Sequence, residues 1–482
     1  MPDKYPRIAT LKTAALLRAH LERSGIDLRF DDELTRPPGS PLAGPLELDG
    51  VKVGNRFCIL PMEGWDGTLD GEPSELTRRR WRHFGSSGAK LIWGGEAVAV
   101  RHDGRANPNQ LLLTPRTLPQ IAALRDELVS VHRSRFGASA DADLFIGLQL
   151  THSGRFSRPD PPGDSAPLAG CAHPLLDRRF SSGVRMLTDD DLDRLVEDFV
   201  AAAKLAADAG FRFVDIKQCH GYLGHELLGA RNRKGRYGGS LKNRLHFLRQ
   251  VIAGIRAAVP SLIIGVRLSA FDMVPHRKGE EDVGVPEGSP ADAKAGFGLL
   301  AGENLDAALK ESRAVVSALE ALGIRWMCIT AGSPYYSPHI QRPAFFPPAD
   351  GYQPPEDPLR GVARQIRATA ILKAAFPRMI FVGSAYSYLQ EWLPHVAQYN
   401  VRNKLTDFVG LGRIVLSYPG LAGDILSGVP LERRHICRTF SDCTTGPRMG
   451  YVSGCYPLDS FYNARPEAPR IQSVRTQSAV HH

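Results

Sequence analysis

Short apolar runs alternate with longer segments of helical apolar spacing from about residue 46 to residue 430. The runs predict eight strands, at 56–60, 90–98, 144–150, 213–217, 263–269, 326–330, 379–382 and 408–411. The segments between them predict helices at 74–86, 117–136, 189–209, 241–258, 304–322, 360–375 and 386–399. This alternation is typical of a parallel sheet with crossover helices. Eight such units predict an α/β protein of the (β/α)8 TIM-barrel class.

The two ends of the chain depart from this pattern. Residues 11–21 have helical apolar spacing, and the sequence PPGSP at 37–41 interrupts any helix there. Beyond the last predicted unit, the chain carries Cys437, Cys443 and Cys455. We therefore expect a helical N-terminal extension over 1–45, a barrel over 46–430 and a cysteine-containing C-terminal tail over 431–482.

The composition places limits on the class of protein. Of the 482 residues, 43% are hydrophobic and 23% are charged, as in ordinary globular domains. No apolar run approaches the ~18–20 residues that a membrane-spanning helix needs, and the first residues lack an apolar signal core. Seven cysteines in so long a chain do not indicate a disulfide framework. These features predict a cytoplasmic protein with no membrane partner.

The chain is basic, with a formal net charge of +9. Because the charges are scattered, they are compatible with an ordinary solvated surface, and also with attraction of phosphate-bearing cofactors or anionic substrates. The sequence has no nucleic-acid-binding motif. We expect small-molecule substrates rather than nucleic acid, and association into a homo-oligomer stays open.

Several polar side chains follow the fourth predicted strand. The apolar run at 213–216 leads directly to Lys217, His220 and Tyr222, and a glycine-rich loop with Tyr-Gly-Gly-Ser at 237–240 comes next. Charged, imidazole and phenol groups are costly to bury without partners. In a barrel of this class, the active site is built on the loops that follow the strands. This stretch is therefore the predicted centre of a functional site.

The same stretch resembles the Old Yellow Enzyme family of FMN-dependent ene-reductases and NADH:flavin oxidoreductases. The resemblance is carried by His-Gly-Tyr-Leu at 220–223, Asn-Arg at 232–233, Tyr-Gly-Gly-Ser at 237–240 and Asn-Arg at 243–244. Gln-x-x-His-x-Gly-Arg at 149–155 and Gly-Arg at 412–413 extend it over roughly 46–425. The sequence departs from the family at Lys217, where relatives have histidine. The resemblance implies FMN as cofactor and NADH or NADPH as electron donor.

The resemblance also implies a set of cofactor-binding positions, which are Pro61, Met62, Glu63, Ala97, Gln149, Arg267, Gly332, Gly383, Ser384, Gly412 and Arg413. A glutamine amide suits the flavin pyrimidine edge because it offers both a donor and an acceptor. Glycine backbone and arginine suit the phosphate. Glu63 stands where relatives carry Thr or Cys. Its carboxylate would disfavour a reduced flavin anion unless it is protonated or turned away, and both alternatives stay open.

Three residues are implied as catalytic. Lys217 and His220 would hold the carbonyl of an acceptor, and Tyr222 would donate a proton to its α-carbon. Trp65 and Tyr335, together with Lys217 and His220, are the predicted substrate contacts. The implied activity passes hydride from NAD(P)H through flavin to a carbonyl- or carboxylate-conjugated alkene, or to a similar electron-poor acceptor. Lysine in place of histidine suggests a preference for substrates with a carboxylate or an acyl thioester.

Two other functions are compatible with these residues. A lysine at the end of a barrel strand also suits a Schiff-base lyase or aldolase, since burial lowers the lysine pKa. Alternatively, Glu63 and Lys217 suit a flavin-binding protein with weak catalysis. The segment 273–303, rich in Gly, Pro and charge, is long for a barrel loop and predicts a lid, a binding loop or a disordered insert.

The tail resembles that of longer, dienoyl-CoA-reductase-like relatives, which hold an iron–sulfur cluster after the barrel. Such a cluster ordinarily needs four cysteines, whereas this tail has three. We expect neither a metal nor a cluster here, and we expect the chain to lack the second flavin domain of those relatives.

Overall fold

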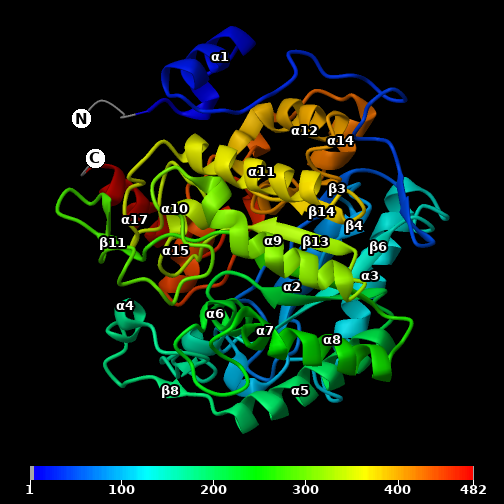
Figure 1. The fold of residues 1–482 in the computed structure, drawn as a ribbon. Helices are drawn as coiled ribbons and strands as arrows, with labels where there is room; N and C mark the ends of the chain where they lie inside the picture. Colours follow the sequence, from blue (N-terminus) through cyan, green and yellow to red (C-terminus); the bar gives the residue numbers. More distant parts are fainter. Residues whose placement is uncertain (1–4, 481–482) are drawn as a thin grey trace.

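The computed structural model describes residues 5–480, with side chains to residue 475, and its centre is a closed parallel barrel (Figure 1). The ring runs in the order β4 (Leu91–Ile92), β3 (Phe57–Ile59), β15 (Phe408–Leu411), β14 (Ile380–Gly383), β13 (Trp326–Thr330), β10 (Ile263–Ser269), β9 (Phe213–Gln218) and β6 (Phe145–Thr151). Pairing of β4 with β6 closes it. The predicted TIM-barrel class and all eight strand positions are confirmed.

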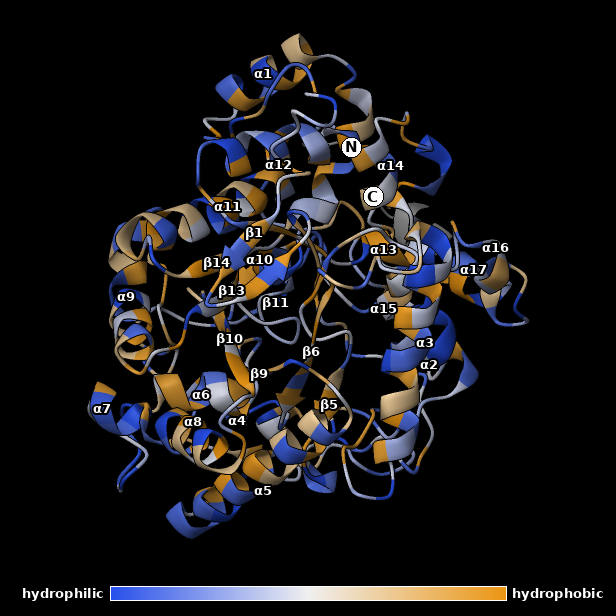
Figure 2. Ribbon diagram, turned by 90° about the vertical axis from the view of Figure 1, so that its right-hand side faces the viewer, coloured by the Kyte–Doolittle hydropathy of each residue, from blue (hydrophilic) through white to orange (hydrophobic). Residues whose placement is uncertain are grey.

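The helices follow the predicted alternation and surround the ring. They are α2 (Glu75–Gly85), α3 (Leu118–Phe136), α5 (Asp189–Asp208), α8 (His246–Ala258), α9 (Leu305–Ala321), α11 (Pro358–Ala375) and α12 (Leu393–Arg402). The start of α5 is fixed by a capping box, in which Thr188 and Asp191 exchange side-chain-to-backbone hydrogen bonds. Figure 2 shows hydrophobic colouring along β9 and β10 inside the ring and hydrophilic colouring along much of α7 (Leu241–Arg244) outside it.

Two predicted elements are interrupted. The second strand is divided into β4 and β5 (Ala97–Ala99), because the chain turns at Gly95 with φ of 50°. A Cβ on Gly95 would lie 2.7 Å from the Trp81 ring, so the turn depends on glycine. The predicted helix at 386–399 begins as a 3-10 helix, Tyr386–Trp392, and becomes regular in α12.

Aromatic side chains fill one end of the barrel. Phe145 and Phe213 stack with ring centroids 4.7 Å apart, and Trp93, Trp326 and Phe408 belong to the same buried cluster. The hairpin of β1 (Leu46–Leu48) and β2 (Val51–Val53) packs against this cluster. Phe145, Phe213, Trp326 and Phe408 stand at the beginnings of their strands, so the barrel is closed at its N-terminal end and any site must lie at the opposite end.

The extension and the insert are both packed against the barrel. Helix α1 (Ala14–Arg23) confirms the predicted N-terminal helix, and its His20 lies 2.7 Å from Asp357 at the start of α11. The 273–303 insert contains the hairpin of β11 (His276–Lys278) and β12 (Gly284–Pro286), and the His276 N–H donates to the Tyr336 carbonyl. The insert therefore buttresses the loop after β13.

The tail returns to the C-terminal end of the barrel. It contains α15 (Asp442–Arg448), α16 (Ser460–Asn463) and α17 (Ala468–Val480). Asp459 accepts two hydrogen bonds from Arg79 of α2, at 2.8 and 3.0 Å. Between residues 5 and 480, no helix combines the length and apolar character that crossing a membrane requires.

Candidate active site

A cavity of about 300 Å³ lies at the C-terminal ends of the barrel strands. It brings together fourteen of the predicted site residues, namely Pro61, Met62, Glu63, Trp65, Ala97, Gln149, Lys217, His220, Tyr222, Arg267, Tyr335, Ser384, Gly412 and Arg413. Two predicted cofactor positions, Gly332 and Gly383, lie outside its lining. Gly332 has φ of 57°, and its carbonyl accepts a hydrogen bond from Ser269, so it shapes the turn after β13.

Gln149 is oriented by a buried carboxylate. Its Nε2 donates to Asp215 Oδ2 at 2.5 Å, and the Arg267 backbone N–H donates to Asp215 Oδ1 at 2.6 Å. Burial raises the pKa of Asp215 to about 6, while these hydrogen bonds oppose the rise. Asp215 was missed by sequence reasoning, because an acidic residue inside an apolar run is the only signal. Its hydrogen bond fixes the orientation of the Gln149 amide.

Arg267 supplies a positive charge to the wall of the cavity. Its Nη1 donates to the Pro61 carbonyl at 3.4 Å, and its buried Nε has no hydrogen-bond partner among the described residues. Its side chain comes from β10, one strand away from Lys217 on β9, with which it is in register. Because a neutral carbonyl does not cancel the charge of a buried guanidinium, this charge is available to a group that enters the cavity.

A second group of arginines lies at another edge of the cavity. Arg342 Nη2 and Arg413 Nη1 are buried and have no hydrogen-bond partner in the described part of the chain. Burial, then Arg413 and Arg448, lowers the pKa of Arg342 to about 9. Arg342 was not predicted, although Gln-Arg-Pro at 341–343 stands in the aromatic-rich loop after β13. Two guanidiniums with nitrogen atoms to spare can bind an anionic group.

Backbone approaches closely at the same edge. A Cβ on Gly410 would lie 2.4 Å from the Gly383 carbonyl oxygen, so β14 and β15 can meet there only with glycine. Gly412 lines the cavity, and a Cβ there would meet nothing nearer than 3.8 Å. The backbone is therefore accessible to a bound group beside Arg413.

Glu63, Lys217, Tyr222 and Tyr335 form a hydrogen-bonded cluster on the other side of the cavity. The Tyr222 hydroxyl donates to Glu63 Oε2 at 2.6 Å and lies 2.8 Å from the Tyr335 hydroxyl. Lys217 Nζ lies 3.8 Å from Glu63 Oε2 and 3.7 Å from the centroid of the Tyr222 ring. Burial raises the pKa of Glu63, and the Lys217 charge opposes this rise. Burial likewise lowers the pKa of Lys217, and Glu63 opposes it.

His220 enters the cavity from a strained turn. Its φ is 66°, and its N–H donates to Ser269 Oγ at 3.1 Å. Its Nε2 lies 3.2 Å from Gln341 Nε2 and 3.4 Å from Thr330 Oγ1. Burial, with Arg267 and Lys217 nearby, lowers the pKa of His220 well below its ordinary value. The imidazole is therefore neutral at pH 7.

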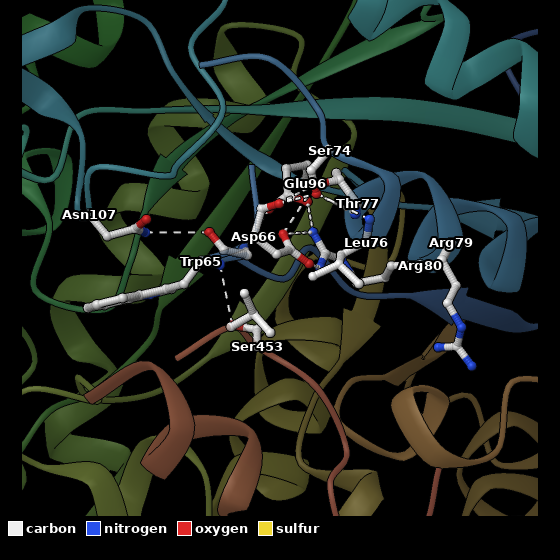
Figure 3. Close-up of polar contacts among 12 residues, drawn as sticks. Trp65, Asp66, Ser74, Leu76, Thr77, Arg79, Arg80, Glu96, Asn107 and Ser453 are labelled. Carbon is white, nitrogen blue, oxygen red and sulfur yellow. Dashed lines mark hydrogen bonds and ion pairs between the residues drawn. The ribbon is translucent and has the colours of Figure 1, made fainter. Parts of the chain in front are cut away.

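A buried ionic network holds the loop that carries Glu63 and Trp65. Figure 3 shows Arg80 of α2 between Asp66 and Glu96, with both of which it forms ion pairs. Glu96 also accepts from the Gly64 N–H at 2.7 Å. Arg80, Asp66 and Glu96 were not among the predicted site residues, because nothing in the spacing of α2 shows that Arg80 points inward.

The tail completes the cavity. The Trp65 N–H donates to Ser453 Oγ at 3.3 Å (Figure 3), and Arg342 donates to Thr444. Cys443 lines the cavity, whereas Cys437 and Cys455 are buried in the tail. Within the described residues, no three His, Cys, Asp or Glu side chains are grouped so that they would hold a metal ion.

Comparison with known proteins gives a consistent family match. Residues 41–295, more than half of the chain, match the family described as NADH:flavin oxidoreductase / NADH oxidase. The chain is 36% identical over 239 residues to 12-oxophytodienoate reductase 1 of Oryza sativa subsp. japonica, a match that covers 48% of this chain and 59% of the relative. It is 30% identical over 243 residues to a probable N-methylproline demethylase of Rhizobium meliloti, covering 49% and 34% respectively. The matches thus span about a third to three fifths of these relatives.

A solved structure shows the same fold. The complex of 2-naphthoyl-CoA reductase with 2-naphthoyl-CoA superposes with a TM-score of 0.63 at 17% identity. The superposition covers 89% of this chain and 58% of that chain. At this level of identity the likeness concerns the barrel and its surrounding elements.

Proposed function

Since the chain belongs to the NADH:flavin oxidoreductase / NADH oxidase family, we propose that it binds FMN and uses NADH or NADPH to reduce an activated alkene or a similar electron-poor acceptor. The observation that carries the proposal is the cavity itself. It combines an anion-binding edge, an amide held in one orientation and a proton-donating phenol at the mouth of one barrel.

The residues present fit FMN. A phosphate dianion needs several donors, and the spare nitrogen atoms of Arg342 and Arg413 lie beside the accessible backbone of Gly412. Gln149 and Arg267 would hold the pyrimidine edge and the region where a reduced ring gathers negative charge. Bound FMN would supply the two-electron chemistry that accepts hydride from NAD(P)H and passes it to the acceptor.

Lys217 and His220 would bind the acceptor's carbonyl oxygen. The neutral His220 can donate one hydrogen bond. The Lys217 ammonium group can donate another, and Glu63 partly balances its positive charge. These two donors would stabilise the charge that develops on the oxygen in the transition state. Tyr222, which lines the same cavity, would deliver the proton to the α-carbon.

We also propose that Lys217 favours acceptors whose carbonyl belongs to a carboxylate or an acyl thioester. An ammonium group stabilises negative charge on such a group better than the neutral imidazole that relatives carry at this position. Trp65 and Tyr335, which both line the cavity, would contact the body of the acceptor.

We keep the division into an extension (1–45), a cofactor-binding barrel (46–430) and a tail (431–482) as a proposal. The tail supplies Thr444 and Ser453 to the cavity wall, so it would be needed for a closed site. The seven free thiols support a cytoplasmic location, because a reducing compartment preserves them. Assembly into a homo-oligomer stays a proposal too.

The visible spectrum of the purified protein tests the proposed function. We expect flavin absorption that bleaches when NADH or NADPH is added without air and returns with an electron-poor alkene. Colourless protein that forms a borohydride-stable adduct on Lys217 would support the Schiff-base lyase instead, which the family match does not favour. Bleaching without any acceptor turnover would mark a flavin-binding protein with weak catalysis.

A further inference from the structure

Glu63 makes the shortest contact of the proposed proton donor, and this contact gives it a role. We propose that Glu63 acts as the proton reservoir of the site, returning to Tyr222 the proton that the phenol gives to the acceptor. The proposal rests on the proposed function and names a further residue in its chemistry. It starts from the hydrogen bond of 2.6 Å between the Tyr222 hydroxyl and Glu63 Oε2.

The charge of Glu63 decides where the single Tyr222 proton points. When Glu63 is a carboxylate, it can only accept, so Tyr222 donates to it and the phenol proton is turned away from an acceptor. When Glu63 is protonated, its own O–H can donate to the Tyr222 oxygen. The phenol O–H is then released toward the cavity or toward Tyr335, whose hydroxyl lies 2.8 Å away.

The proton transfers balance in two steps. The Tyr222 O–H bond breaks as its proton bonds to the α-carbon, while the hydride that NAD(P)H ultimately provides adds to the β-carbon. The Tyr222 oxygen then takes the proton of Glu63, which is left as a carboxylate 3.8 Å from Lys217 Nζ. A proton from the solvent reprotonates Glu63 between turnovers, so the net reaction consumes one hydride and one solvent proton and neither residue is changed.

The surroundings favour such a reservoir. Among the described residues, the ionisable groups that face the Glu63 carboxyl are Lys217 from β9, Tyr222 from the loop after β9 and Tyr335 from the loop after β13. Burial raises its pKa, and Lys217 and Tyr222 hold part of the rise back. Burial, followed by Glu63 itself, raises the pKa of Tyr222 well above its ordinary value, so the phenol alone is a poor acid. A general acid works best with a pKa near the working pH.

The test is the pH dependence of acceptor reduction by pre-reduced enzyme, for the wild type and Glu63→Gln. Because the protonated form of Glu63 is required, the wild-type rate should fall as pH rises through the Glu63 pKa, well below the phenol range near about 10. In Glu63→Gln this fall of the rate with pH (the pH limb) should disappear. At pH values below the Glu63 pKa, the rate of this variant should be at least tenfold lower than that of the wild type. Glu63→Asp should regain a limb at reduced rate, which a merely structural role would not give.

Absorbance titration of tyrosine in the full-length protein gives a second readout that does not need turnover. Removing the carboxylate charge should let Tyr222 ionise at lower pH in Glu63→Gln than in the wild type. The part of the absorbance change that is lost in Tyr222→Phe is the part that belongs to Tyr222. Tyr335→Phe, which keeps the carboxylate, should retain the wild-type pH limb.

The outcomes separate the two proposals. Protein without a flavin spectrum overturns the proposed function. The tyrosine titration then still tests whether the charge of Glu63 controls the ionisation of Tyr222. Flavin-loaded, active enzyme whose pH limb is the same in the wild type and Glu63→Gln overturns the reservoir. An identical tyrosine titration in these two proteins overturns it as well.

Discussion

Replacing Arg342 by alanine separates the phosphate contribution to cofactor binding from all other contributions. Arg342 Nη2 has no partner among the described residues and lies beside Arg413 at the edge of the cavity. A hydrogen bond to a charged group contributes about 1.5–3 kcal/mol. At about 1.4 kcal/mol per tenfold, Arg342→Ala should weaken FMN binding roughly 10- to 100-fold. Riboflavin, which lacks the phosphate, should lose less than about threefold by the same reasoning.

The same substitution should stabilise the protein that has no cofactor. Burial and two neighbouring arginines lower the pKa of Arg342 to about 9, so its charged form is held at a cost in the folded state. Water in the cavity screens much of this cost, and we expect a gain of about 1–2 kcal/mol in the free energy of unfolding. Cofactor affinity and apoprotein stability should therefore move in opposite directions.

Fluorescence titration with FMN and with riboflavin measures the two affinities, and chemical denaturation measures the stability. Arg116→Ala removes one positive charge at an exposed position and serves as the control for net charge. Equal weakening of FMN and riboflavin in Arg342→Ala would refute the reasoning, because the loss would then not come from the phosphate. Lower stability of the apoprotein would refute the claim that the arginines repel one another.

Three further predictions concern the remaining groups of the site. Tyr222→Phe should retain flavin bleaching by NADH but reduce an enone about 10²–10⁴-fold more slowly, and stopped-flow measurement of the two half-reactions will show whether the loss is confined to the second. Lys217→His should lower the ratio of enoate to matched neutral enone turnover about tenfold, and an unchanged ratio counts against a role for its charge. Asp215 has a folded pKa near about 6, above its ordinary value, so its contribution to stability is complete at low pH and is lost as pH rises through 6. In the wild type, the free energy of unfolding measured by denaturation should fall by about 2–3 kcal/mol over this pH range, and in Asp215→Asn this fall should be absent. The same pH dependence of the unfolding free energy in both proteins would contradict the assignment.

The repeating pattern of strands and helices was predictable because it depends on local periodicity. All eight strands follow from runs of four to nine residues, and the barrel follows from their number and order. The break at Gly95 was not predictable. It exists because the Trp81 ring of α2 occupies the space where a side chain would stand. That contact is a property of the folded chain.

The chemistry was predictable only where a family motif marks it. Gln149, Arg267 and Tyr222 could be proposed from the motifs that contain them, but Asp215 and Arg342 were not marked by any such motif. Their importance arises from contacts between strands and loops far apart in the sequence. The same holds for Glu63, whose partner Tyr222 lies 159 residues further along the chain. A single sequence gives the types of residue, whereas their partners come from the fold.

The distribution of charge in the cavity explains why an acidic residue stands at position 63. Arg342 and Arg413 each keep a guanidinium nitrogen with no hydrogen-bond partner in the described part of the chain, and Arg267 donates to a carbonyl, so these regions can attract anions. Lys217, by contrast, lies 3.8 Å from the Glu63 carboxylate. Glu63 therefore keeps the acceptor end close to neutral, and the phosphate and ring ends keep their positive charge. An FMN molecule would thus be drawn into the cavity in one direction, with its phosphate at the arginines and its ring below Tyr222.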